Sequence, residues 1–145
     1  MIERFERFSY FVSELSRCLH RLAGEEMGKY DLKGSYAIYF TTLLRSPGIT
    51  SAQLAELTGR DKADVSRAIA VLEKKGLVAR QAGYRANLQL TQSGTELSCA
   101  LSKRISAAVS YAGKDLSDGD RNIFYACLES LVQNLQNLDL TALEV

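Results

Sequence analysis

Apolar residues recur every three or four positions along the N-terminal part of the chain. The series consists of Phe5, Phe8, Val12, Leu15, Leu19 and Leu22. This spacing places the residues on one face of an α-helix, in the a and d positions of about two and a half heptads. We predict a helix from about Ile2 to Met27. Because that helix would expose a long apolar seam, we expect a partner helix to cover it.

A glycine-containing stretch separates this helix from a second one, predicted from about Lys33 to Ser46. The second helix is apolar around most of its circumference and should therefore lie centrally. The sequence SPG, which contains Pro47, ends it. A short third helix follows, with a capping box formed by Thr50 and Gln53. We expect it to pack through Leu54 and Leu57 and to end at Gly59.

The fourth helix is amphipathic and has a start and a stop signal. Asp61 is a suitable N-cap, and Gly76 lies where a C-terminal glycine is expected. At about 100° per residue, two faces are predicted. The buried face consists of Val65, Ala68, Ile69 and Leu72. The opposite face consists of Ala63, Arg67, Ala70 and Lys74, with Lys62 and Ser66 on one flank.

Two short strands are predicted next, at residues 77–80 and 87–90, with the hairpin tip QAGYRA between them. Thr91 is placed to cap a fifth helix, and Ser117 to cap a sixth. Both helices carry apolar series. These are Leu97, Leu101, Ile105, Ala108 and Ala112 on the fifth, and Phe124, Leu128, Leu131, Leu135 and Leu138 on the sixth.

Two helices joined by a tight glycine-containing turn, the second polar on its outer face, form a helix-turn-helix. The pair alone is a weak indication of DNA binding, because many short helix pairs only pack. The hairpin strengthens the indication, since a helix-turn-helix followed by a two-stranded tip is a winged helix. The tip can place Arg85 in or near a minor groove.

The outer face of the fourth helix fits entry into a major groove. Ala63 and Ala70 let the backbone approach closely, and Arg67 has the planar fork that pairs with O6 and N7 of guanine. Ser66 can bond a base or a phosphate, whereas Lys62 is better interpreted as a phosphate contact.

Thr50, Ser51 and Asp64 are further candidate DNA contacts. For Asp64 two interpretations stay open, because a carboxylate near phosphates weakens binding unless it accepts from a cytosine amine. An ordinary solvated face is the alternative for the whole surface. For Lys74 and Lys75 we prefer that alternative, with a favourable position at the negative end of the helix dipole.

Charge and composition narrow the function classes. The 145-residue chain has a net charge of +1, but residues 50–91 contain seven basic and four acidic residues, a mildly basic middle. The single histidine argues against a metal site of the His-rich kind, and no catalytic motif is present. With three widely spaced cysteines, no spanning segment and no signal peptide, we expect a cytoplasmic protein that is not an enzyme and needs no cofactor.

The sequences LEKKGLV (residues 72–78) and LQLTQSG (residues 88–94), which flank the hairpin, resemble the MarR family of bacterial transcription regulators. The likeness extends over nearly the whole chain, because that family also has a long first helix and two long C-terminal helices. It implies a homodimer with intertwined terminal helices and two winged helices on a roughly palindromic operator. The apolar seams give an independent reason to expect a dimer.

The wing departs from the family pattern, which is longer and has an acid closely followed by arginine. Here no acid lies between Arg80 and Thr91, and Arg85 is the one basic residue. Either Arg85 keeps the minor-groove role on a shortened tip, which we favour, or the wing contributes mostly through Tyr84 and its backbone.

The resemblance also implies a small-molecule effector between the dimer helices and the DNA-binding lobe. His20, Tyr36 and Tyr39 could line such a site, although aromatic residues on an apolar helix usually belong to the core. Cys18 invites comparison with hydroperoxide sensors, but it does not align with their reactive cysteine. We expect Cys18 to be a small buried hydrophobic residue.

The sequence thus predicts a mainly α fold with a small β-hairpin wing, in which a winged helix-turn-helix is flanked by long dimerisation helices. Within a single domain, residues 33–91 form the DNA-binding lobe, and residues 1–30 and 92–145 form the dimerisation lobe. The expected function is that of a ligand-responsive, homodimeric, sequence-specific repressor acting on double-stranded DNA. The alternatives are a winged helix that contacts only proteins and, with less support, a cysteine-based redox regulator.

Overall fold

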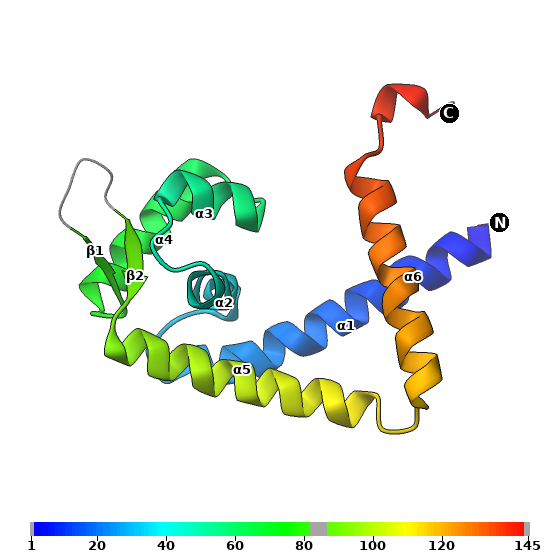
Figure 1. The fold of residues 1–145 in the computed structure, drawn as a ribbon, viewed down its shortest axis with the longest axis horizontal. Helices are drawn as coiled ribbons and strands as arrows, with labels where there is room; N and C mark the ends of the chain where they lie inside the picture. Colours follow the sequence, from blue (N-terminus) through cyan, green and yellow to red (C-terminus); the bar gives the residue numbers. More distant parts are fainter. Residues whose placement is uncertain (1, 82–86, 144–145) are drawn as a thin grey trace. The chain divides into compact units, whose positions relative to one another are not determined.

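A computed structural model describes residues 2–81 and 87–143 (Figure 1). Its helices and strands are α1 (Ile2–Gly28), the 3₁₀ turn η1 (Gly34–Tyr36), α2 (Ala37–Arg45), α3 (Ser51–Thr58), α4 (Lys62–Lys74), β1 (Val78–Arg80), β2 (Leu88–Leu90), α5 (Gln92–Ala112), α6 (Asp118–Gln136) and the 3₁₀ turn η2 (Leu140–Ala142). The predicted fold class, mainly helical with an antiparallel hairpin, is confirmed.

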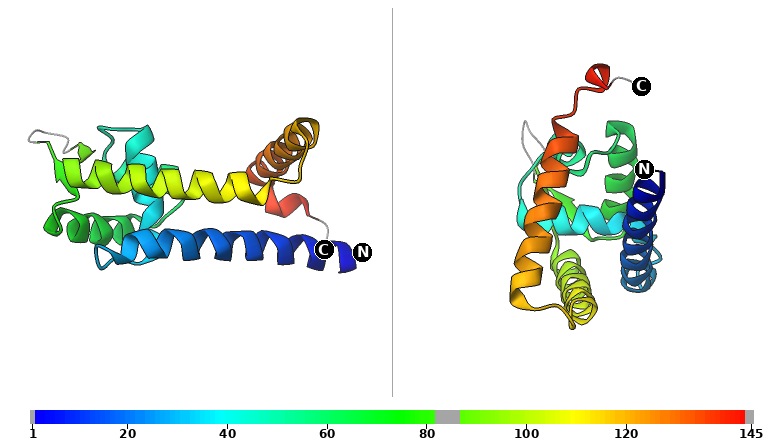
Figure 2. Two further views of the ribbon diagram at one scale, coloured as in Figure 1. Left: turned by 90° about the horizontal axis from the view of Figure 1, so that it is seen from below. Right: turned by 90° about the vertical axis from the view of Figure 1, so that its right-hand side faces the viewer.

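The chain consists of two compact units, Met1–Ala107 and Ala108–Val145. The first contains α1 to α4, the hairpin and most of α5, and α2 lies at its centre (Figures 1 and 2). Its core is made of apolar side chains from all of these elements. Those that are fully buried include Met27, Phe40, Leu43, Leu54, Val65, Ile69, Leu72, Leu77, Leu88, Leu97 and Leu101.

The two strands pair in the register Val78↔Leu90, Ala79↔Gln89 and Arg80↔Leu88. The segment before α3 joins the same ladder, because Leu88 N–H donates to the Ile49 carbonyl at 2.8 Å and Gly48 N–H donates to the Leu88 carbonyl at 3.0 Å. The base of the hairpin is therefore fixed to the start of the helix pair by backbone hydrogen bonds.

The N-terminus of α5 is tied to the end of α4. The Thr91 hydroxyl donates to the Gly76 carbonyl at 2.6 Å and accepts from Gly94 N–H at 3.1 Å. Gly94 itself lies so close to the first strand that a Cβ there would come within 2.0 Å of the Leu77 carbonyl oxygen. A glycine at this position allows α5 to begin directly beneath the hairpin.

Two packing expectations were wrong. In α3, Leu57 is exposed and Ala55 is buried beside Leu54. The short helix meets its neighbours along the edge formed by Leu54, Ala55 and Thr58, so that Leu57 points away from them. Cys18 is exposed rather than buried, because within the described chain α1 is buried only towards its C-terminal end, from Ala23 onwards.

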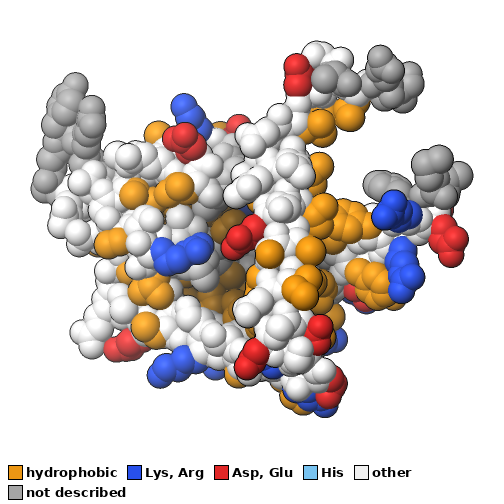
Figure 3. All heavy atoms as spheres, turned by 45° about the vertical axis from the view of Figure 1, so that its right-hand side comes forward, with side chains coloured by type: hydrophobic (Ala, Val, Ile, Leu, Met, Phe, Trp, Pro, Cys, Tyr) orange, Lys and Arg blue, Asp and Glu red, His pale blue; other side chains and the backbone are white. Residues whose placement is uncertain are grey.

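In the second unit, α6 begins as predicted at Ser117, whose hydroxyl accepts from Asp120 N–H at 3.1 Å. None of the residues of α6 is buried. Hydrophobic side chains lie along its surface (Figure 3). The large exposed apolar residues of α6 are Ile123, Phe124, Tyr125, Leu131, Val132 and Leu135.

Candidate nucleic-acid interface

The fourth helix begins at a well-formed cap. One carboxylate oxygen of Asp61 accepts from Ala63 N–H at 2.8 Å and from Asp64 N–H at 3.3 Å. These are two of the backbone donors that a helix start leaves without partners. At the other end Gly76 has a φ of +70°, a left-handed conformation that suits glycine. The limits of α4 are thus set by its own sequence, as predicted.

The structure separates the two faces of α4 as the sequence predicts. Val65, Ala68, Ile69 and Leu72 are buried. The candidate DNA contacts Lys62, Ala63, Asp64, Ser66 and Arg67 are all exposed, as is Ala70. Four apolar anchors hold the helix against the core, so the outer face is presented on a fixed support rather than on a loop.

An ion pair crosses this outer face. The Arg67 guanidinium donates from Nη2 to Oδ1 of Asp64, one helical turn earlier. This contact gives the Asp64 carboxylate a partner within its own helix, in addition to the two interpretations that the sequence leaves open. The spacing of three positions was the signal that pointed to it.

The predicted contacts at the start of α3 lie in a complete capping box. Thr50 N–H donates to Oε1 of Gln53 at 2.9 Å, and Gln53 N–H donates to the Thr50 hydroxyl at 3.2 Å. The neighbouring hydroxyl of Ser51 is buried and has no hydrogen-bond partner among the described residues. Thr50 therefore serves the helix start itself, whereas the Ser51 hydroxyl is not used within the described part of the chain.

A shallow cleft of about 420 Å³ lies between α3 and the start of α4. Its lining includes Gln53, Arg60 and Lys62. Arg60 was not singled out from the sequence, although its place in the turn between the two helices, two residues before Lys62, was a usable signal. The two residues bring positive charge to the same edge of the helix pair.

At the base of the hairpin, Arg80 is held by α4, because its Nε donates to Oε1 of Glu73 at 2.9 Å. The predicted wing contacts Tyr84 and Arg85 lie outside the described residues. Lys75 lies 3.8 Å from a carboxylate oxygen of Asp31 and so faces the first unit's own surface.

The three candidate effector residues occupy different environments. His20 is exposed, Tyr36 is partly buried and Tyr39 is buried. The two tyrosine rings meet edge to face, with centroids 6.0 Å apart. The pKa of Tyr39 is raised, mainly by burial. The negative charge of Asp64 adds to this increase, and the positive charge of Arg60 opposes it. The buried ring therefore lies near the turn and the start of α4.

Other kinds of site find no support in the described residues. They contain no group of three or more His, Cys, Asp or Glu side chains able to hold a metal ion. In the same part of the chain, no helix is both long and apolar enough to cross a membrane.

Comparison with known proteins identifies the helix-turn-helix segment. Residues 30–85 match the model of the MarR family. No curated protein sequence matches the chain.

Several solved structures have the same fold. A MarR transcriptional regulator from Methanosarcina mazei Go1 is 24% identical, with a TM-score of 0.80 and 92% of each chain covered. A putative MarR family transcriptional regulator from Listeria monocytogenes, complexed with 26mer DNA, is 22% identical, with a TM-score of 0.78 and 87% of each chain covered. Residues 30–85 therefore resemble the MarR family, and the chain has the winged helix-turn-helix fold of these solved structures.

Proposed function

We propose that the protein is a sequence-specific, double-stranded DNA-binding transcription regulator that acts as a homodimer. The observation that carries this proposal is the outer face of α4. It presents Lys62, Ser66 and Arg67 around two alanines on a helix whose opposite face is fully buried. A helix of this kind enters a major groove, where an arginine fork reads guanine and lysine neutralises phosphate.

A relative of similar fold supports the choice of partner, because the Listeria monocytogenes protein was solved in complex with DNA. On this chain, Arg67, Ser66 and Ala63 would face base edges, and Lys62 would face a phosphate. Arg85 and Tyr84, in the hairpin tip, are proposed to touch the flanking backbone or minor groove.

The proposed dimer rests on apolar side chains of α1 and α6 that are exposed in the described part of the chain. On α1 the exposed residues include Phe8, Val12, Leu15 and Leu19, and on α6 they include Phe124, Leu131 and Leu135. Exposed apolar surface of this extent usually marks an interface. Two copies would place two α4 helices about one helical turn apart on a roughly palindromic operator.

We further propose that the regulator is a repressor released by a small effector. The two tyrosines on η1 and α2 lie near the start of α4 through the Tyr39 ring, so a ligand held by Tyr36 and Tyr39, with His20, would act close to the DNA-binding helix. The ligand would lower the affinity for DNA by the same factor by which it binds the DNA-free protein more tightly than the DNA-bound protein.

A selection of bound sequences from a random duplex library tests DNA binding, dimer symmetry and half-site spacing together. We expect an inverted repeat, and a log–log plot of affinity against salt with a clearly negative slope. Arg67→Ala should cost about 1–3 kcal/mol and relax one position of each half-site, whereas Lys62→Ala should weaken all sequences similarly.

A winged helix that contacts only proteins is the second candidate, favoured by the modest net charge of residues 50–91. Under that hypothesis the library yields no enriched sequence, and binding at low salt shows no dependence on Arg67. The absence of an enriched sequence would remove the proposal of sequence-specific DNA binding, and binding that does not depend on Arg67 would remove the groove-facing assignment of α4.

A further inference from the structure

The groove face of α4 contains one acidic residue among small, hydroxyl and basic ones. Asp64 is not required for capping, because Asp61 already accepts from the backbone N–H groups of Ala63 and Asp64. The carboxylate of Asp64 is instead bonded to Nη2 of Arg67. The helix therefore places an anion beside the arginine that is proposed to read a base.

Stability does not account for this pair. The side chains of Asp64 and Arg67 are 59% and 72% exposed, and exposed ion pairs between neighbouring turns contribute little to the free energy of unfolding. A carboxylate on a surface that approaches phosphates also weakens binding to every DNA sequence. Its place in the first turn suits the helix dipole, and its one side-chain partner among the described residues is Arg67.

The geometry leaves the reading edge of Arg67 available. A guanidinium has five N–H donors in one plane, and the bond to Asp64 uses Nη2. Nη1, Nε and the second hydrogen of Nη2 remain able to donate. Pairing with O6 and N7 of guanine needs two neighbouring donors in a fixed direction. Asp64 thus restricts where the fork points while using only one of its N–H donors.

We propose that Asp64 is a positioning residue that makes Arg67 selective for one base pair. This inference rests on the proposed DNA-binding function. By holding the guanidinium over the groove face, Asp64 reduces the side-chain freedom that binding must remove. It also disfavours arrangements in which Arg67 swings away to a phosphate, because Asp64 would then lose its partner near other negative charges. Asp64 therefore lowers affinity for DNA in general and raises discrimination at the base pair read by Arg67.

The test compares the full-length wild type with Asp64→Asn, which keeps the side-chain shape and removes the charge. The probes are a duplex carrying the selected operator, the same duplex changed at the Arg67 position, and a random-sequence duplex. For Asp64→Asn we expect discrimination between the first two to fall about fivefold. Affinity for the random duplex should rise about threefold at low salt.

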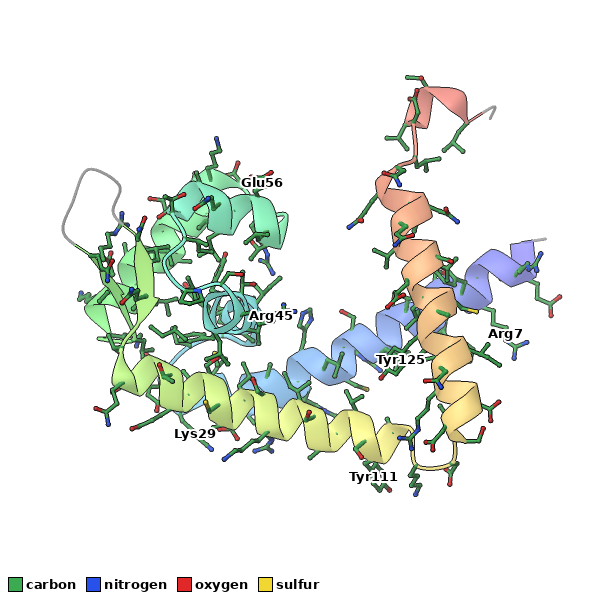
Figure 4. All side chains as sticks on the ribbon, in the orientation of Figure 1. Arg7, Lys29, Arg45, Glu56, Tyr111 and Tyr125 are labelled. Atoms are coloured by element: carbon green, nitrogen blue, oxygen red, sulfur yellow. The ribbon has the colours of Figure 1, made fainter. Side chains whose placement is uncertain are left out.

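Glu56→Gln is the matched control. Glu56 is an exposed acid on α3 (Figure 4), so this variant removes the same charge from the same helix pair. We expect it to leave discrimination at the Arg67 position unchanged. An equal loss of discrimination in Glu56→Gln would overturn the proposal, because net charge alone would then explain the effect.

A second comparison shows whether Asp64 acts through Arg67. In an Arg67→Ala background, Asp64→Asn should change affinity but no longer change discrimination. If it still lowers discrimination there, Asp64 reads a base itself, for example a cytosine amine, and the positioning role is wrong. Unchanged discrimination for Asp64→Asn alone also refutes it.

Failure of the proposed function gives a different result. If the wild type shows no sequence-specific binding, DNA recognition by this face is refuted before any variant is compared. If the wild type binds its operator and Asp64→Asn, folded as shown by an unchanged unfolding midpoint, discriminates equally well, only the role of Asp64 is refuted.

Discussion

The fourth and sixth helices carry the same kinds of sequence signal but differ in how far their apolar faces are buried. Each begins at a side-chain cap, Asp61 in one and Ser117 in the other, and each carries a regular apolar series. In α4 the apolar series is buried, whereas in α6 no residue is buried. Caps and periodicity therefore define a helix, but they do not say whether its apolar face is covered within the same chain.

This difference separates two kinds of stability. The first unit closes its own core, and α4 is anchored in it by buried residues. The apolar face of α6 is covered only in part within the described chain, so most of its contribution is expected to come from association. We therefore expect substitutions in α4 to change unfolding, and substitutions in α6 to change assembly.

The largest effect is expected from Leu72→Ala, which removes a side chain that is 0% exposed on the inner face of α4. The lost burial and the cavity left behind should reduce the free energy of unfolding by about 2–5 kcal/mol, as measured by urea denaturation. Leu57→Ala on α3 is the control, since Leu57 is 60% exposed and its truncation should cost less than about 0.5 kcal/mol. Equal losses for the two variants would contradict the described core.

Leu135→Lys tests whether the exposed apolar face of α6 takes part in assembly. Leu135 is 62% exposed on α6, so a charge there should leave the fold of the first unit intact. In the proposed dimer the same charge would be buried, and the dimer dissociation constant should rise on the order of 100-fold. Sedimentation at several concentrations measures this.

Gln133→Lys introduces the same charge on α6 outside the apolar series and should leave the dissociation constant nearly unchanged. A monomeric wild type, or equal behaviour of the two lysine variants, would exclude α6 as the dimer surface.

Much of the fold could be predicted because its signals are local. The capping box at Thr50, the cap at Asp61 and the apolar alternation of the strands each depend on residues within a few positions of one another. The exposure of Leu57 could not be predicted, because a short helix can turn either of two edges inward, and tertiary packing decides which. Cys18 was misjudged for a related reason, since its burial requires a neighbour that the first unit does not supply.

In the candidate site, the groove-facing residues followed from helical periodicity, but their partners did not. The pairing of Arg67 with Asp64 competes with contacts to bases or phosphates, and sequence spacing alone does not rank these choices. The bond from Arg104 to Glu26 joins residues 78 positions apart, so no local pattern indicates it.

Gly94→Ala tests the close packing between the hairpin and the start of α5. The added Cβ would come within 2.0 Å of the Leu77 carbonyl oxygen, so α5 or the strand must move, at a cost of about 1–3 kcal/mol. Gly119→Ala in the first turn of α6 is the control, because its Cβ would come no closer than 3.8 Å to Ser117 Oγ. It should be neutral or stabilising by less than about 1 kcal/mol. Thermal unfolding of both variants provides the comparison, and a neutral Gly94→Ala would contradict the close approach.

The smallest effect concerns Glu26, which links α1 to α5 within the first unit. Its carboxylate accepts from Lys29 Nζ and from Arg104 Nη1, both at 2.7 Å. These two hydrogen bonds hold the pKa of Glu26 below its ordinary value, although burial opposes them.

A lowered pKa in the folded state means that the unfolded chain binds the proton more readily. The contribution of Glu26 to stability is therefore complete above the ordinary glutamate pKa of about 4.3 and is lost as the pH falls through the lower, folded value. Glu26→Gln should lower the free energy of unfolding at pH 7 and make its decline below about pH 4 shallower. Denaturant unfolding from pH 7 to pH 3 measures both, with Glu129→Gln on exposed α6 as the control for losing one carboxylate. A decline that is as steep in Glu26→Gln as in the wild type would show that the Glu26 cluster does not couple α1 to α5 energetically.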